Sequence, residues 1–306
     1  MKPPVALIAG PTASGKSALA LMLAERTGGA IVNADSAQIY RDLSILSAAP
    51  SPDDRARAEH LLYGIRDGAD PCSAADWAAI ASAEIARLHE EQRLPILVGG
   101  TGLYLRALLD GIAPVPSIDP EIRSEVRAES VAENLTALTN LDPAAAAKLN
   151  PGDTVRIARA LEVVKSTGRT LGEWQQRREG GIGGKIGLRP LTLLPPRPWL
   201  YERCDQRFAA MVDDGAIAEV EALLARKLDP QLPVMRAIGV PELGALLRGE
   251  MTRAQAISAG QLATRCYAKR QYTWFAHQPP PDWPRFEEAL EAGALDRALA
   301  LLAKAE

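Results

Sequence analysis

The sequence has 306 residues, which is longer than one typical domain and predicts one enzyme-sized core with a smaller appended or inserted part. With 47% hydrophobic and 24% charged residues, the chain can bury a sizeable core, so the disordered, collagen-like and low-complexity classes are excluded. The net charge of −3 argues against a strongly basic coat for nucleic acid over the whole surface.

Targeting and metal-binding patterns are also lacking. No apolar run approaches the ~18 to 20 residues of a membrane span, and a Pro-Pro pair and a glycine-rich turn stand where a signal peptide would have its apolar stretch. We therefore expect a cytoplasmic protein without a membrane segment. The three cysteines and three histidines are scattered and form no CxxC pair, which argues against a disulfide scaffold or a zinc site.

The first hundred residues alternate between strand and helix patterns. Residues 5–9 form a fully apolar run typical of a buried parallel strand, and residues 16–26 follow with apolar side chains at helical spacing. Residues 30–33 and 95–98 predict two more strands, and residues 73–93 predict the helix between them. This order predicts an α/β fold, a P-loop-type parallel sheet flanked by helices.

The middle of the chain predicts a helical insertion domain. From 118 to about 180 there are helical patterns without a convincing strand, including a helix that Asp153 would cap and Gly168 would end. A strand is expected again at 188–194, and from 199 the chain reads as mostly helical, with breaks at 229–233 and 278–281. We expect a catalytic core of residues 1–117 and 188–306, with an insertion at 118–187.

Positive charge is concentrated locally. Residues 148–189 contain nine basic and four acidic side chains. Residues 264–274 contain Arg265, Lys269 and Arg270 and no acid. These two segments are candidate contacts for a phosphate-rich partner.

A complete phosphate-binding loop follows the first strand. It has the pattern G-x-x-x-x-G-K-[ST] in the residues Gly10, Pro11, Thr12, Ala13, Ser14, Gly15, Lys16 and Ser17. The glycines permit close approach of the backbone, successive N–H groups and the helix N-terminus hold anionic oxygens, and Lys16 adds a positive charge. Ser17 is the expected Mg²⁺ ligand. The motif predicts a site for a di- or triphosphate, and it is also the usual ATP-binding motif.

Two polar residues follow neighbouring strands and are expected at the same crevice. Asp35 is a candidate general base or a helix cap, and the sequence leaves both open. Thr101 could bind a reacting group, although capping of the next helix is the favoured interpretation. The third strand ends at Gly99 and Gly100 without the carboxylate that nucleotide hydrolases place there, which argues against an ATPase.

Blocks of residues in a fixed order resemble the tRNA dimethylallyltransferases. They are the phosphate loop, Asp35-Ser36-Ala37 with Ile39-Tyr40, residues 73–76, residues 97–105, residues 116–123, residues 159–163, and residues 268–271 with Thr273-Trp274. Each block alone is weak, but together they cover positions 10 to 274.

The resemblance implies transfer of a dimethylallyl group from dimethylallyl diphosphate to N6 of the adenosine at position 37 of tRNA, next to the anticodon. It implies Asp35 as the base and Thr101 as its partner in the catalytic site. Lys16, and Ser17 with Mg²⁺, would stabilise the departing diphosphate. Arg203 and Arg207 are expected to help, although surface salt bridges explain these two arginines equally well.

The resemblance also implies contacts with the anticodon stem-loop of tRNA. The family's contact positions correspond here to Asp35, Ser36, Ala37, Gln38, Thr101, Arg123 and the helix with Arg156 and Arg159. Arg265 and Lys269 are further candidates, because basic residues and aromatics alternate around them. Core packing remains the favoured interpretation of Trp274. We expect a monomer.

Three segments depart from the family pattern. Ala49 stands where members usually have a lysine, Glu59-His60 where they have two histidines, and Val240-Pro241 where they have a tyrosine and a basic residue. We expect reduced or altered tRNA affinity. The alternatives to prenyl transfer are a small-molecule or nucleoside kinase using ATP and a non-catalytic RNA-binding module, and the basic helical insertion favours a tRNA enzyme over a kinase.

Overall fold

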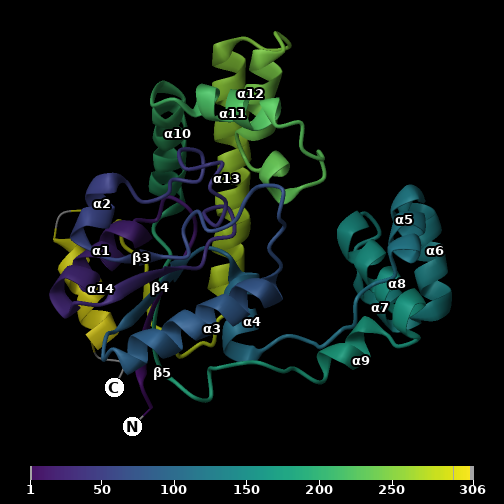
Figure 1. Ribbon diagram of the computed structural model, residues 1–306, viewed down its shortest axis with the longest axis horizontal. Helices are drawn as coiled ribbons and strands as arrows, with labels where there is room; N and C mark the ends of the chain where they lie inside the picture. Colours follow the sequence, from purple (N-terminus) through teal and green to yellow (C-terminus); the bar gives the residue numbers. More distant parts are fainter. Residues whose placement is uncertain (1, 292, 304–306) are drawn as a thin grey trace. The chain divides into compact units, whose positions relative to one another are not determined.

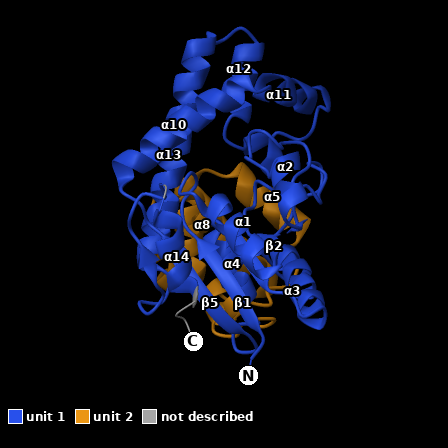
Figure 2. Cartoon of the chain, turned by 90° about the vertical axis from the view of Figure 1, so that its left-hand side faces the viewer, with its two compact units in different colours: residues 1–108, 182–306 blue, residues 109–181 orange. Residues whose placement is uncertain are grey.

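The structure is a computed structural model that describes residues 2–291 and 293–303. The chain divides into two compact units, one of residues 1–108 and 182–306 and one of residues 109–181, shown in different colours in Figure 2. The insertion thus begins nine residues before the expected boundary at 118 and ends six residues before the one at 187. Isolated bridge pairing of Ile112 with Glu179 draws the two ends of the smaller unit together.

The larger unit is built on a parallel sheet, in the order β3-β2-β4-β1-β5-β6 within the described residues. Its strands are β1 (Pro4–Ala9), β2 (Ala30–Asn33), β3 (His60–Leu61), β4 (Pro95–Gly99), β5 (Gly187–Leu193) and β6 (Arg285–Phe286). All pairings are parallel, and β4 lies between β1 and β2 (Figure 1). The expected α/β fold is confirmed.

Helices cover both faces of this sheet. The helices of the larger unit are α1 (Lys16–Thr27), α2 (Pro52–Arg57), α3 (Ala74–Glu90), α4 (Gly102–Asp110), α10 (Arg197–Asp213), α11 (Ala216–Ala225), α12 (Val240–Leu247), α13 (Arg253–His277) and α14 (Ala294–Ala303), with a 3₁₀ turn η1 (Pro233–Arg236). Among them, α11 packs against α10 and α12, and α12 packs against α13. α1 and α14 bury their apolar faces against Ile8, Ile96 and Leu191 of the sheet. Alternate side chains of the same strands point to the opposite face, on which α3 packs against β2 and β4.

The expected strands and helices occur within a few residues of their predicted limits. The sequence did not predict α2, β3 or β6. The two strands have two residues each, and so short a strand carries no detectable alternation. Asp153 and Gly168 cap the two ends of α8 (Thr154–Thr167) as predicted.

The smaller unit is helical. It contains α5 (Pro120–Ala128), α6 (Val131–Leu141), α7 (Pro143–Lys148), α8 and α9 (Leu171–Gln175). Val126, Leu138, Ile157 and Leu161 form its own apolar core, so the unit buries a hydrophobic face without the sheet. No helix in the described residues is long and apolar enough to cross a membrane.

Candidate active site

The phosphate loop connects β1 to α1. Gly10 has no room for a side chain, because a Cβ would lie 2.5 Å from the carbonyl oxygen of Leu193. Gly15 has a φ of 93°, a left-handed conformation that glycine adopts without strain, and it precedes the first turn of α1. The loop therefore presents backbone N–H groups and the N-terminus of α1 to one point, an arrangement that binds anions.

The side chain of Lys16 folds back onto the phosphate loop. Its Nζ donates a hydrogen bond to the carbonyl oxygen of Pro11 at 2.6 Å. Burial lowers the pKa of Lys16 to about 8, and the negative charge of Asp35 partly opposes this shift. An anion that enters beside Lys16 would restore the preference for the charged ammonium.

Two arginines of α10 contact the phosphate loop. Arg203 Nε donates to the carbonyl oxygen of Ala13 at 3.2 Å, and Arg207 donates to Thr12 Oγ1. Burial lowers the pKa of Arg207. The interpretation of these two residues as surface salt bridges is therefore wrong, because both side chains lie against the loop.

Asp35 is oriented by Asn33, a buried residue at the end of β2. Asn33 Oδ1 accepts the backbone N–H of Asp35 at 2.8 Å, and Asn33 Nδ2 donates to the carbonyl oxygen of Asp35 at 3.0 Å. Asp35 Oδ1 then accepts the N–H of Ala37 at 3.0 Å. Residues 36–50 contain turns and no helix, so Asp35 caps a turn and not the helix that we considered.

Thr101 contacts the turn after Asp35. Its Oγ1 accepts the N–H of Ser36 at 2.9 Å and donates to Ser36 Oγ at 3.2 Å. The expectation that the Thr101 side chain caps α4 is wrong, because the hydroxyl joins the ends of β2 and β4. The Asp35 turn and Thr101 thus form one hydrogen-bonded wall.

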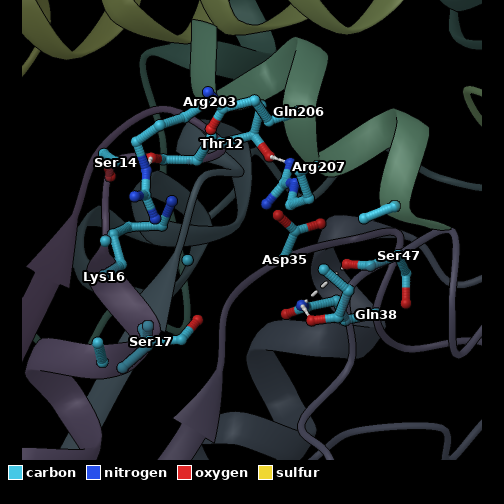
Figure 3. Close-up of a pocket in the computed structure, with 17 residues that line it drawn as sticks. Thr12, Ser14, Lys16, Ser17, Asp35, Gln38, Ser47, Arg203, Gln206 and Arg207 are labelled. Carbon is cyan, nitrogen blue, oxygen red and sulfur yellow. Dashed lines mark hydrogen bonds between the residues drawn. The ribbon is translucent and has the colours of Figure 1, made fainter. Parts of the chain in front are cut away.

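A cavity of about 500 Å³ separates this wall from the phosphate loop. Lys16 and Ser17 lie on one side of it and Asp35 and Gln38 on the other, with Arg207 above Asp35 (Figure 3). Gln38 Nε2 donates to the carbonyl oxygens of Ser47 and Ala48 at 3.0 and 2.7 Å, and so holds the segment that includes Ala49 beside the cavity.

A second cavity of about 500 Å³ adjoins the first. The two share the residues Thr12, Asp35, Ser47 and Arg207. Apolar and aromatic side chains dominate the second cavity, among them Leu43, Leu46, Leu103, Tyr104, Phe208, Met211, Ile238 and Tyr267. Burial raises the pKa of both Tyr104 and Tyr267, so their hydroxyls stay protonated at neutral pH.

The sequence did not identify the apolar lining of this cavity or Gln271. The lining residues come from loops, α4, α10 and α13, and nothing in their spacing places them together. Gln271 belongs to the block at residues 268–271 that resembles the family, but that block assigns it no role. The structure shows that its side chain is buried and hydrogen-bonded to the backbone of Thr12 and Gly100.

One candidate tRNA contact of the smaller unit, Arg159, pairs with a buried carboxylate. Glu162 is 1% exposed, and it pairs with Arg127 at 2.9 Å and with Arg159 at 3.8 Å. Arg123 is exposed, and its charge helps to lower the pKa of Arg159, after the larger effect of burial. Arg156 is exposed and pairs with Asp153 at 3.6 Å.

The basic and aromatic residues of α13 that were considered as tRNA contacts lie in different surroundings. Arg265 forms an ion pair with Asp205 of α10, and Lys269 is exposed. Tyr267 lines the second cavity, under the guanidinium of Arg270 at 5.6 Å. Trp274 is half-buried and packs against Gly102, where a Cβ would lie 2.4 Å from the indole.

The chain matches the family model for IPP transferases over residues 38–278. It belongs to the IPP transferase family. The chain is 61% identical to the tRNA dimethylallyltransferase of Sphingopyxis alaskensis over 95% of this chain and 96% of that protein. It is 60% identical to the enzyme of the same name from Erythrobacter litoralis, over 94% of this chain and 92% of that one.

Solved structures of similar proteins have the same fold. The tRNA isopentenylpyrophosphate transferase of Bacillus halodurans aligns with a TM-score of 0.70 and 30% identity, covering 100% of this chain and 98% of that one. A eukaryotic dimethylallyltransferase acting on tRNA aligns with a TM-score of 0.76 and 26% identity over 89% of this chain and 69% of that one. The chain is therefore an enzyme of the prenyltransferase class, and the kinase and the non-catalytic module are not supported.

Proposed function

We propose that this enzyme transfers a dimethylallyl group from dimethylallyl diphosphate to N6 of the adenosine at position 37 of tRNA. One observation carries the proposal: the phosphate loop faces Asp35 across a cavity that shares lining residues with a second cavity of apolar and aromatic groups. The anionic leaving group of the substrate matches the first cavity, and its apolar prenyl group matches the second.

The leaving diphosphate is assigned to the loop side. Backbone N–H groups, Lys16 and the arginines of α10 surround the first cavity. In prenyl transfer the bond between C1 and the diphosphate oxygen breaks, and negative charge grows on that oxygen. Fixed cations and amides stabilise this charge without reorganisation, which lowers the barrier.

A magnesium ion is assigned to the same side. Within the described residues no group of three or more His, Cys, Asp or Glu side chains is arranged to hold a metal ion. The residues nevertheless fit Mg²⁺, because this ion keeps waters and uses substrate phosphates beside few protein ligands. Ser17 lines the cavity and would supply a hydroxyl ligand. Bound Mg²⁺ would neutralise diphosphate charge.

Asp35 is assigned the role of base. The exocyclic amine of adenine is a weak nucleophile, because its lone pair is delocalised into the ring, so the proton must leave as N6 attacks C1. Asp35 Oδ1 is engaged by Ala37, and no group in the described residues donates to Oδ2. Oδ2 is therefore the oxygen that accepts the proton. Thr101 is assigned the positioning of the wall beside it.

The acceptor is assigned to the second cavity. An adenine must leave its stack in the anticodon loop to reach Asp35, at a cost of a few kcal/mol. Tyr267 and Tyr104, whose ring stacks on Trp77, line the cavity, and Phe208 and Met211 offer an apolar surface for the prenyl methyls. Arg123, Arg156, Arg159, Arg265 and Lys269 are proposed contacts with the phosphates of the stem-loop. A tRNA substrate and a monomeric, cytoplasmic enzyme complete the proposal.

The proposal is tested by incubating the purified protein with Mg²⁺, unmodified tRNA and either dimethylallyl diphosphate or ATP. The expected result is an adenosine whose mass has increased by one dimethylallyl group, together with released diphosphate, only in the first mixture. Phosphorylation of nucleoside or RNA by ATP, with no prenylated product, would contradict it.

A further inference from the structure

One buried amide joins the two sides of the active-site cavity. Gln271 lies on α13 and is 5% exposed. Its Oε1 accepts the backbone N–H of Thr12 at 2.7 Å, and its Nε2 donates to the carbonyl oxygen of Gly100 at 2.9 Å. Both ends of the side chain are thus committed to backbone groups of other segments.

These two backbone groups lie in segments that serve different functions in the site. Thr12 is part of the phosphate loop, and its side chain accepts a hydrogen bond from Arg207. Gly100 precedes Thr101, whose hydroxyl holds the turn after Asp35. The amide therefore connects the segment that would hold the leaving group to the wall that would hold the base.

The bridge depends on the residue type at both of its ends. A Cβ on residue 100 would lie 2.2 Å from Nε2, so the close approach requires glycine at that position. The bridge also needs an acceptor and a donor on one side chain of this length, which an amide provides and an ionised carboxylate does not. A buried N–H or carbonyl group without its partner is unfavourable, so both bonds favour a single spacing.

We propose that Gln271 is a positioning residue, which sets the distance between the diphosphate loop and the Asp35–Thr101 wall during prenyl transfer. The inference rests on the proposed function and deepens it. Reaction rates fall steeply when the reacting groups are displaced by about 1 Å. Loss of the bridge should therefore slow the chemical step more than it weakens the binding of either substrate alone.

The test compares Gln271→Met with Gln261→Met. Methionine has a similar length but forms neither bond. Gln261 is on the same helix and donates to the carbonyl oxygen of Asp205 at 3.1 Å, so its variant also loses one hydrogen bond to a backbone group outside α13. The measurements are single-turnover prenyl transfer, affinity for inorganic diphosphate with Mg²⁺, affinity for an anticodon stem-loop, and thermal unfolding.

We expect Gln271→Met to lose at least about tenfold in the single-turnover rate, while both affinities change by less than about threefold. Gln261→Met should keep a rate within about twofold of the wild type. Equal rates for Gln271→Met and the wild type, or an equal loss in both variants, would overturn the inference, because either result means that the amide only stabilises the fold.

Gln271→Glu provides a second route if the methionine variant does not fold. An ionised carboxylate accepts from Thr12 but cannot donate to Gly100, so the rate should fall in this variant also, and an unchanged rate would overturn the inference. A wild-type protein without any prenyl transfer would overturn the proposed function and this inference together. An active wild type with equally active variants would overturn this inference alone.

Discussion

At the scale of single residues, Asp35 is prepared for its role by neighbours that use only one of its oxygens. Asn33 fixes the backbone of Asp35 on both sides, and Ala37 binds Oδ1. Asparagine at position 35 would keep the acceptor for Ala37 but would not take up a proton. We expect Asp35→Asn to lower the rate of prenyl transfer by about 10²- to 10⁴-fold, measured in single turnover.

The same variant should bind the anticodon stem-loop and diphosphate nearly as well as the wild type, because the turn around residue 35 is retained. Asp70→Asn is the matched control, since Asp70 is an exposed carboxylate whose partner is Arg66 at 3.5 Å. Near-normal turnover of Asp35→Asn would remove Asp35 as the base.

Lys16 predicts a pH dependence of diphosphate binding. Burial lowers the pKa of Lys16 to about 8 in the free protein, so the side chain is charged below this pH and becomes neutral above it. The affinity for inorganic diphosphate should therefore decrease as the pH rises through about 8. Titration calorimetry at a series of pH values, with Mg²⁺ held constant, measures this effect.

Lys16→Arg is the control for that experiment, because a guanidinium stays charged throughout this range. Its affinity should be lower overall, since arginine has a different shape, but it should lack the step near pH 8. A step of the same size in both proteins would assign the titration to another group.

At the scale of elements, the pair α10 and α13 serves both cavities. Arg203 and Arg207 of α10 and Gln271 of α13 contact the phosphate loop, while Phe208 and Tyr267 of the same helices line the second cavity. Leu200, Cys204 and Ala268 pack between the helices near the loop. A change in the packing of this pair should therefore affect both ends of the site.

Gly260 of α13 lies directly against Phe208 of α10. A Cβ on this residue would lie 2.0 Å from Phe208 Cζ, so Gly260→Ala must move the phenyl ring or separate the helices. We expect a loss of about 1 to 3 kcal/mol in the free energy of unfolding, which denaturant titration measures. The displaced ring should also raise the KM for dimethylallyl diphosphate.

Gly244→Ala on α12 is the matched control. Its Cβ would contact Arg248 Nη1 at 3.2 Å, the end of a flexible side chain, and Leu224 Cδ1 at 3.5 Å. Alanine is the better helix former by roughly 0.5 to 1 kcal/mol, so this variant should unfold at an equal or higher denaturant concentration. Equal destabilisation by both changes would argue against a specific contact between Gly260 and Phe208.

At the scale of the whole molecule, the distribution of charge corrects the interpretation of the helical insertion as basic. Residues 109–181 contain nine basic and eleven acidic side chains, so the smaller unit as a whole is not basic. Much of the positive charge of residues 148–189 is also paired within the unit, as in the pairs of Arg156 with Asp153 and Lys165 with Glu125. The excess of positive charge is local: Arg127 and Arg159 share the carboxylate of Glu162, and the charge of Arg123 contributes to lowering the pKa of Arg159.

This local cluster predicts which charge contributes to the salt dependence of tRNA binding. Arg123 is exposed and forms no ion pair in the described part of the chain. If it contacts a phosphate, Arg123→Gln should weaken binding of the stem-loop and reduce the slope of log K against log salt by about 1. Filter binding at several salt concentrations measures the slope.

Arg177→Gln removes the same charge from a side chain that is 83% exposed and pairs with Glu179 at 3.2 Å. Its salt slope should remain close to that of the wild type, and neither variant should change the affinity for diphosphate. A slope that is unchanged by Arg123→Gln would exclude this residue as a phosphate contact.

The sequence by itself determined the features that depend on neighbouring residues along the chain. The phosphate loop, the longer strands and the caps at Asp153 and Gly168 follow from local backbone geometry and hydrophobic period, so they were predictable. The family was predictable too, because its blocks of residues keep their order.

Only the tertiary structure decided how distant residues combine. Whether Thr101 caps a helix or braces Asp35, and whether Arg203 and Arg207 lie on a surface or against the phosphate loop, depends on segments 65 to 195 positions apart. The bridge by Gln271 and the lining of the second cavity are of the same kind. These contacts arise from the packing of helices on a sheet, and packing leaves no periodic signal in the sequence of any one segment.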